Sequence, residues 1–142
     1  MEPRITIVTL GVKDLQRSYD FYCRGLKFPT NSDIKDGILF IQTQGTRLAL
    51  YPFEKLEEDI GIEFPQQHTG FRGITFAHNT KKRQDVDAVL QLAQQSGGTI
   101  EKAAQDVFWG GYSGYFSDPD GYLWEVAYAD SFQFNEDGSL VI

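Results

Sequence analysis

The chain has 142 residues, of which 41% are hydrophobic and 14% aromatic, enough for the core of one domain or two very small ones, and most of it is therefore not disordered. Its 20 acidic and 13 basic residues give a formal net charge of −7, which repels phosphate backbones and anionic membranes and argues against nucleic-acid binding. No apolar run reaches the ~20 residues of a membrane helix, and the start of the chain is unlike a signal peptide. We expect a soluble cytoplasmic protein.

The first half of the chain has the pattern of a strand, a helix and further strands. Residues 4–12 alternate β-branched and smaller side chains, as a strand does. Asp14 can cap a helix that follows it. Strands are predicted over residues 37–43 and 46–51, after a short extended piece around Phe28. The helix is expected to bury one stripe of side chains, formed by Leu15, Tyr19, Tyr22 and Leu26.

The second half repeats this order after an acidic connector at residues 53–70, which is expected to hold a short helix around residues 54–59. A strand is predicted over residues 71–78. The next helix is expected to bury a stripe formed by Val86, Val89, Leu90 and Ala93. Three more strands are predicted, over residues 99–102, 111–117 and 122–128.

The repeated order predicts an α+β fold of two βαβββ modules that together form a curved mixed sheet around a cavity. Module one spans residues 1–52, the connector 53–70 and module two 71–129. Each module alone has a single helix and would leave one face of its sheet uncovered. The tail at residues 130–142 is expected to pack at a sheet edge or at a dimer contact.

One carboxylate, Glu125, lies inside an otherwise apolar strand. Strand alternation places it on the same face as Leu123 and Ala127 and on the opposite face from Trp124 and Val126. Burying an ionised carboxylate without a partner is costly. We therefore expect Glu125 to be paired, bound to a cation, protonated, or solvated at a cavity wall.

Three stretches of the chain resemble the vicinal oxygen chelate superfamily, which includes glyoxalase I, extradiol dioxygenases and bleomycin-resistance proteins. They are LGVKDLQRSYDFYCRGLKF at residues 10–28, FRGITFAHN at 71–79 and VFWGGYSGYFSDPDGYLWEVAYA at 107–129. The combination of L-x-V-x-D-L, S-x-x-F-Y and D-P-D-G-x-x-W-E covers nearly the whole chain up to about Ala129. One departure is Lys27, which follows Leu26 where the family usually has glycine. The resemblance implies the two-module fold and, as in many relatives, a homodimer.

The resemblance also places four metal-ligand positions, because metal-dependent members present one ligand, usually His or Glu, from each of four strands. These positions fall at Ile7, Ala49, Gly73 and Glu125. Only Glu125 has a side chain that can coordinate a divalent ion, so we expect no metal cofactor at the family site. A site rebuilt from His68, Glu125 and a carbonyl oxygen is the remaining metal alternative.

Four further residues are candidate ligand contacts. Arg47 shares strand parity with Tyr51, so it is expected either to pair with Glu125 or an anionic substrate, or to be a solvated cation at a strand end. Trp109 and Tyr112 flank two glycines, whose backbone freedom lets an aromatic side chain close over a ligand. Plain packing is the alternative for both.

Three functions fit these residues. In the first, a metal-independent protein binds a planar or cationic organic molecule, with Tyr51, Trp109 and Tyr112 stacking and Glu125 supplying charge. In the second, a lyase, isomerase or dioxygenase-like enzyme uses Glu125 as general base or metal ligand, with Arg47 or a weakly held metal stabilising an oxyanion. In the third, the chain is a structural or regulatory module with a vestigial cavity.

Overall fold

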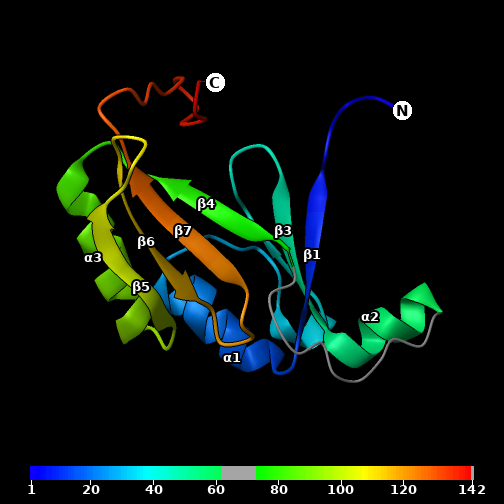
Figure 1. Cartoon of the computed structure of the whole chain (residues 1–142). Helices are drawn as coiled ribbons and strands as arrows, with labels where there is room; N and C mark the ends of the chain where they lie inside the picture. The colour runs from blue at the N-terminus through cyan, green and yellow to red at the C-terminus, as the bar shows by residue number, and fades with distance from the viewer. Residues whose placement is uncertain (62–72, 142) are drawn as a thin grey trace. The chain divides into compact units, whose positions relative to one another are not determined.

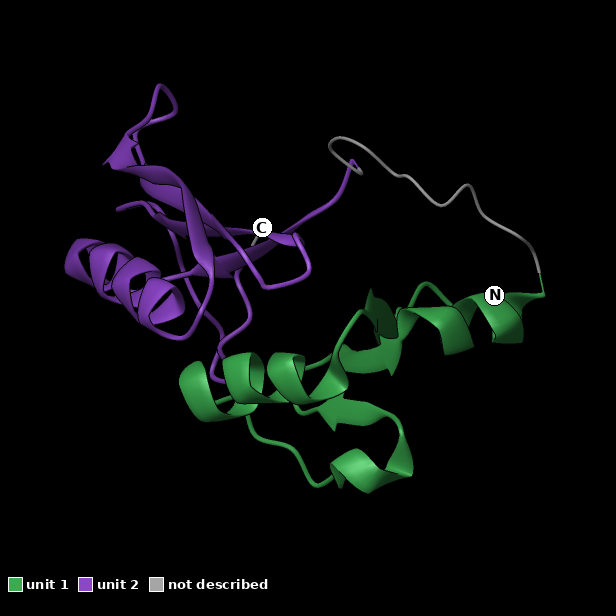
Figure 2. Ribbon diagram, turned by 90° about the horizontal axis from the view of Figure 1, so that it is seen from below, with its two compact units in different colours: residues 1–72 green, residues 73–142 purple. Residues whose placement is uncertain are grey.

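The structure is a computed structural model that describes residues 1–61 and 73–141 (Figure 1). The chain divides into two compact units, Met1–Arg72 and Gly73–Ile142 (Figure 2). Each unit contains one mixed sheet and at least one helix, so the expected α+β class is confirmed. None of the helices in the described ranges is long and apolar enough to cross a membrane.

Unit 1 holds a three-stranded sheet with the order β1-β3-β2. Strand β1 is parallel to β3, and β2 is antiparallel to β3. The extended piece expected around Phe28 is reduced to one isolated bridge between Thr30 and Ile41. The elements of this unit are β1 (Ile7–Val12), α1 (Leu15–Tyr19), the π-helix η1 (Asp20–Gly25), the 3₁₀-helix η2 (Ile34–Asp36), β2 (Leu39–Ile41), β3 (Arg47–Pro52) and α2 (Phe53–Ile60).

The first helix starts where the sequence predicts but buries a different stripe. The Asp14 carboxylate accepts a hydrogen bond from the backbone N–H of Arg17 at 3.0 Å, which confirms the cap. After α1 the backbone widens into η1, and the wider turn changes which side chains face the sheet. The buried side chains are therefore Ser18, Phe21 and Tyr22, so the stripe predicted with a 3.6-residue period was correct only at Tyr22.

The chain leaves η1 through a left-handed residue. Lys27 has φ of +64°, a conformation that costs little for glycine and more for any residue with a Cβ. This is the position at which the resemblance leads one to expect glycine. Lysine therefore occupies a backbone conformation that suits glycine better, directly after the end of the helix.

The two faces of the unit 1 sheet differ in their cover. One face carries the buried core side chains Leu10, Val12, Leu39, Ile41, Leu48 and Leu50. On the other face, Gly11 lies directly under α2, since an added Cβ would approach Cδ2 of Phe53 to 2.7 Å. The short helix expected around residues 54–59 is thus confirmed, and its first turn packs on β1.

Unit 2 holds a four-stranded sheet with the order β4-β7-β6-β5 and one long helix (Figure 1). Strand β4 is parallel to β7, and the other neighbours are antiparallel. Its elements are β4 (Thr75–Asn79), α3 (Arg83–Gln95), β5 (Thr99–Asp106), β6 (Tyr112–Ser117) and β7 (Leu123–Tyr128). Helix α3 packs against β5, β6 and β7, and three of the four stripe residues predicted for it, Val86, Leu90 and Ala93, are buried.

The turn between β6 and β7 fixes their register. One oxygen of the Asp118 carboxylate accepts hydrogen bonds from the backbone N–H groups of Asp120 at 2.9 Å and Tyr122 at 2.8 Å. Gly121 has φ of +86°, which a turn residue without a side chain adopts readily. This turn sets Ser117 opposite Leu123 and, further along, Tyr115 opposite Glu125.

Candidate functional site

Strands β6 and β7 have one face that forms the core of unit 2. This face carries Phe116 and Trp124, whose rings stack with centroids 6.1 Å apart and planes 2° apart. At Gly114, an added Cβ would lie 2.7 Å from Cδ1 of Leu90 in α3. Phe116, Trp124 and Val126 are buried, so this side of the sheet, which we call the helix face, is filled by packing against α3.

The opposite face of the same strands, which we call the open face, carries Glu125. The register pairs Glu125 with Tyr115 and Ala127 with Ser113, so the alternation predicted from the sequence is confirmed. Glu125 is half-buried. Tyr115 lies directly opposite it, and burial first, and then hydrogen bonding with Glu125, raise the pKa of Tyr115 above its ordinary value.

Residues on the two flanking strands, β5 and β4, continue this pair into a row across the four-stranded sheet. Lys102 of β5 lies opposite Tyr115, and its Nζ is 5.9 Å from the centre of the Tyr115 ring. On the other side, Ala77 of β4 lies opposite Glu125. We call Lys102, Tyr115 and Glu125 the cross-strand row. It places a cation, a phenol and a carboxylate side by side on the open face.

The structure places the residues that occupy the family metal positions. Ile7 is 46% exposed on β1, and Ala49 is 1% exposed on β3, while Gly73 precedes β4 with φ of +72°. None of the three has a side-chain donor. Within residues 1–61 and 73–141, no group of three or more His, Cys, Asp and Glu side chains gathers that could hold a metal ion. The alternative ligand His68 lies outside the described residues.

The second histidine, His78, is turned away from Glu125. It lies opposite Val126, whereas its neighbour Ala77 lies opposite Glu125, and adjacent strand residues point to opposite faces. The residue is exposed at the edge strand, yet the surrounding protein desolvates the imidazole and lowers its pKa. His78 therefore belongs to the helix face and does not join the cross-strand row.

Arg47 and Tyr51 lie on one face of β3, as their spacing predicts. Arg47 is opposite Ile7 and Tyr51 is opposite Gly11 in the parallel β1 strand. The Arg47 guanidinium donates a hydrogen bond to the Thr43 carbonyl oxygen at 2.7 Å and is exposed. Both residues belong to unit 1 and Glu125 to unit 2, so the pairing of Arg47 with Glu125 stays a prediction.

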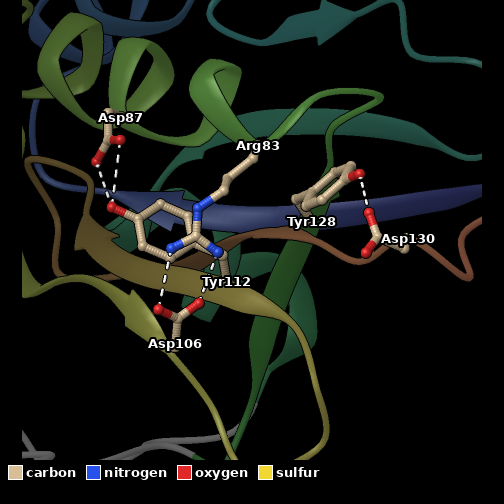
Figure 3. A network of polar contacts seen from close by, with 6 residues as sticks. All are labelled: Arg83, Asp87, Asp106, Tyr112, Tyr128 and Asp130. Atoms are coloured by element: carbon tan, nitrogen blue, oxygen red, sulfur yellow. Dashed lines mark hydrogen bonds and ion pairs between the residues drawn. The ribbon is translucent and has the colours of Figure 1, made fainter.

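Tyr112 lies on the helix face and ties β6 to α3 (Figure 3). Its hydroxyl donates to the Asp87 carboxylate at 3.0 Å, and the Arg83 guanidinium carbon is 3.8 Å from the centre of its ring. Arg83 also holds Asp106 through two hydrogen bonds of 2.6 and 3.1 Å, which lower the pKa of Asp106. We call Arg83, Asp87, Asp106 and Tyr112 the tyrosine–arginine network. Because Tyr112 and Glu125 are on opposite faces, a ligand lying on one face does not contact both.

Trp109 contacts its own loop and the tail. Its ring lies over Gly111, where an added Cβ would be 1.7 Å from Cζ3 of the indole. The ring also stacks on Phe132 with centroids 6.3 Å apart and planes 24° apart. The tail forms an isolated bridge of its own between Phe134 and Leu140 and contacts unit 2 through Phe132, while its role at a dimer contact stays a prediction.

An open depression of about 530 Å³ lies at the start of α3. Its lining residues are Lys81, Lys82, Arg83, Gln84, Asp87 and Tyr128. Three of these are cationic, but Arg83 is already paired with Asp106 and Asp87 contributes the opposite charge. With Asp106 counted, three cations face two carboxylates, so the depression keeps an excess of only one positive charge.

Sequence reasoning missed Tyr115 and Lys102 as members of the site. Tyr115 is one of several aromatic residues between Val107 and Phe116, and only its register opposite Glu125 distinguishes it. The turn residues from Asp118 to Gly121 were the available signal for that register. Lys102 had no such signal, because the register of β5 against β6 shifts on both sides of it.

Comparison with known proteins agrees with this architecture. The sequence model of the Glyoxalase/Bleomycin resistance protein/Dioxygenase superfamily matches residues 4–126. A glyoxalase-related enzyme from Fulvimarina pelagi is 28% identical, with a TM-score of 0.88 over 99% of this chain and 98% of its own. No curated protein sequence matches the chain.

Two other solved structures share the fold at lower identity. A glyoxalase/bleomycin resistance protein/dioxygenase from Nocardioides is 23% identical, with a TM-score of 0.75 over 92% of this chain and 87% of its own. A lactoylglutathione lyase from Agrobacterium tumefaciens is 20% identical, with a TM-score of 0.65 over 90% of this chain and 95% of its own.

Proposed function

We propose that this chain, which belongs to the Glyoxalase/Bleomycin resistance protein/Dioxygenase superfamily, binds a small organic molecule at Glu125 without the four-ligand metal site of metal-dependent relatives. Membership alone does not give a function, because one fold supports many. The observation that carries the proposal is the half-buried Glu125 carboxylate on the open face, directly opposite the Tyr115 phenol.

The state of Glu125 favours a ligand with a cationic or N–H donor group. A carboxylate has about four acceptor sites on its two oxygens, and a single phenol such as Tyr115 can use one of them. A phenol is neutral, so it leaves the negative charge of Glu125 uncompensated. Among the described residues no cation lies within ion-pair distance of this carboxylate, and an ammonium group on a ligand would supply that charge through a charge-assisted hydrogen bond.

The donor chemistry of the family positions supports a metal-independent mode. Ile7, Ala49 and Gly73 offer an aliphatic group, a methyl group and a hydrogen, and none of these binds a divalent cation. Glu125 alone would hold such an ion weakly. The carboxylate itself is therefore the anchor in this proposal, and the ligand needs no metal to reach it.

The test is titration calorimetry with benzylamine and the neutral benzyl alcohol as probes. Wild-type protein is expected to bind benzylamine at least roughly tenfold more tightly, since a charge-assisted hydrogen bond contributes about 1.5 kcal/mol or more. Glu125→Gln keeps the shape of the side chain, removes its charge and should abolish this preference. Glu58→Gln removes an equal charge from an exposed residue of α2 and should leave it intact. Equal binding of both probes by the wild type would refute the proposal.

A second candidate is an enzyme in which Glu125 acts as general base on a carbon acid. The solved structure that is 28% identical over nearly the whole chain belongs to a glyoxalase-related enzyme. This similarity favours an enzymatic function over a module with a vestigial cavity. The Tyr115 phenol lies directly opposite the carboxylate, where a hydrogen bond from its hydroxyl would orient the carboxylate, as a base requires. The check is exchange of protons beside a carbonyl carbon in deuterated water, followed by NMR. An enzyme should lose exchange in Glu125→Gln while its fold persists.

A further inference from the structure

The structure assigns a ligand class to this face: we infer that it takes a small zwitterion whose ammonium group binds Glu125 and whose carboxylate binds Lys102, across the ring of Tyr115. This inference rests on the proposed function, since it assumes that Glu125 is a ligand anchor. It adds a second anchor of opposite charge and so restricts the class of ligand.

The register supports two anchors at a defined spacing. Lys102, Tyr115 and Glu125 lie directly opposite one another on the neighbouring strands β5, β6 and β7. Two strand spacings separate the backbones of Lys102 and Glu125, which is about 10 Å. Both side chains contact Tyr115, so both extend over the open face. A ligand lying along the row meets a cation at one end, an aromatic ring in the middle and a carboxylate at the other.

Neither charge of the row is compensated by the described residues. The contact of Lys102 within that part of the chain is the Tyr115 ring, and no ion pair joins Lys102 to an acid there. The neighbouring Glu101 instead accepts a hydrogen bond from the Ser117 hydroxyl at 2.6 Å. An amine would compensate the charge of Glu125 only, and an anion would compensate the charge of Lys102 only. A zwitterion forms charge-assisted hydrogen bonds with both residues.

Small side chains flank the row on the open face. Ser113 and Ser117 occupy the same-face positions on either side of Tyr115, and Ala127 follows Glu125 on β7. A fourth small residue, Ala77 of β4, lies opposite Glu125 and ends the row. Ser113, Ser117 and Ala127 are themselves buried. Lys102 is exposed and Glu125 is half-buried, so the two charged groups of the row remain accessible to a partner.

The test uses three matched probes: 4-(aminomethyl)benzoate, benzylamine and benzoate. In 4-(aminomethyl)benzoate the two charges stand at opposite ends of a benzene ring, and each of the other probes keeps one of them. The wild type is expected to bind the zwitterion roughly tenfold more tightly than benzylamine, the factor that one added charge-assisted hydrogen bond supplies. Lys102→Met keeps the apolar stem, removes the charge and should make the two affinities equal. Lys102→Arg should restore the preference, and Lys35→Met, an exposed lysine of unit 1, should not alter it.

The outcomes separate this inference from the proposed function. The inference is overturned if the wild type binds the zwitterion no more tightly than benzylamine, or does not bind it. Either result leaves benzylamine binding through Glu125, and with it the proposed function, intact. An unchanged preference in Lys102→Met overturns it as well. Retained benzylamine binding in Glu125→Gln removes the proposed function and the inference together. An unchanged melting temperature of Lys102→Met and Glu125→Gln shows that both variants are folded.

Discussion

Two tyrosines three residues apart on β6 form clusters of opposite character on the two faces of one sheet. On the helix face, Tyr112 joins Arg83, Asp87 and Asp106 in contacts that pair the Arg83 guanidinium with Asp106 (Figure 3). On the open face, Tyr115 stands between Lys102 and Glu125 without bringing them together. A cluster whose charges pair within the protein stabilises the fold, whereas a cluster whose charges stay apart is suited to bind something else.

The largest effect is expected from filling the helix face at Gly114. An added Cβ would lie 2.7 Å from Cδ1 of Leu90 and 2.8 Å from the Lys102 carbonyl oxygen, so Gly114→Ala forces α3 or β5 to move. We expect a loss of about 2 to 3 kcal/mol in the free energy of unfolding, the usual cost of overpacking a core. Urea denaturation measures it.

The control for Gly114→Ala is a truncation on the open face. Gln105 lies opposite Ser113 and is exposed, so Gln105→Ala should change the free energy of unfolding by no more than about 0.5 kcal/mol. A cost of Gly114→Ala no larger than that of Gln105→Ala would show that the two faces do not differ in packing.

The second expected effect is a difference between the two tyrosines when each loses its hydroxyl. Tyr112→Phe removes the bonds to both Asp87 oxygens, at 3.0 and 3.2 Å, and should lower the melting temperature. Tyr115→Phe should change the melting temperature less, because Glu125 remains half-exposed to water, but should alter benzylamine affinity. Thermal unfolding and calorimetry of the same two variants give both readouts. The reverse order of melting temperatures would contradict the contrast between the clusters.

The third effect is an acid-dependent loss of stability that depends on Asp106. The hydrogen bonds from Arg83 lower the folded-state pKa of Asp106 below its ordinary 3.8. A lowered carboxylate pKa stabilises the fold above about pH 4, and this contribution is lost as the pH falls through the folded-state value. Asp106→Asn should melt at a lower temperature than wild type at neutral pH, and the gap should narrow in acid. A difference in melting temperature between Asp106→Asn and wild type that stays constant from neutral to acidic pH would exclude the Arg83–Asp106 ion pair as its cause.

The smallest effect is a shift in the titration of one phenol. Desolvation first, and the bond to Glu125 second, raise the pKa of Tyr115 above its ordinary 10.0. Glu125→Gln should bring the Tyr115 pKa part of the way down, because the larger cause, desolvation, remains. Ultraviolet difference titration against Tyr115→Phe isolates this phenol. The fold should lose stability as the pH rises through the Tyr115 value, because the folded state favours the protonated phenol.

The sequence predicted the elements of unit 2 and the face of Glu125 because both follow from local patterns. Alternation in β7 and the turn at Asp118 are local signals, and both were confirmed. The stripe of the first helix was wrong because the change from α1 to η1 does not show in a 3.6-residue period. The sequence predicted that Tyr112 and Glu125 contact one ligand, but the two residues lie on opposite faces of the sheet. Their faces can be compared only once the register of β6 with β7 is known.

Other expectations depend on information that no local pattern holds. The position of Lys102 beside Tyr115 depends on register shifts in β5, and such bulges have no strong sequence signal. The closure of the two modules around a cavity, the homodimer and a role for His68 stay predictions. They concern contacts between distant parts of the chain or between chains, which alternation and spacing do not specify.

The most direct test of the account is benzylamine binding to wild type and Glu125→Gln, each measured before and after removal of divalent ions with a chelator. The account predicts binding by the wild type that the chelator leaves unchanged and that Glu125→Gln abolishes, with Glu58→Gln behaving as wild type. Binding that disappears with the chelator, or that persists in Glu125→Gln, would contradict the claim that the charge of this carboxylate anchors the ligand without a metal.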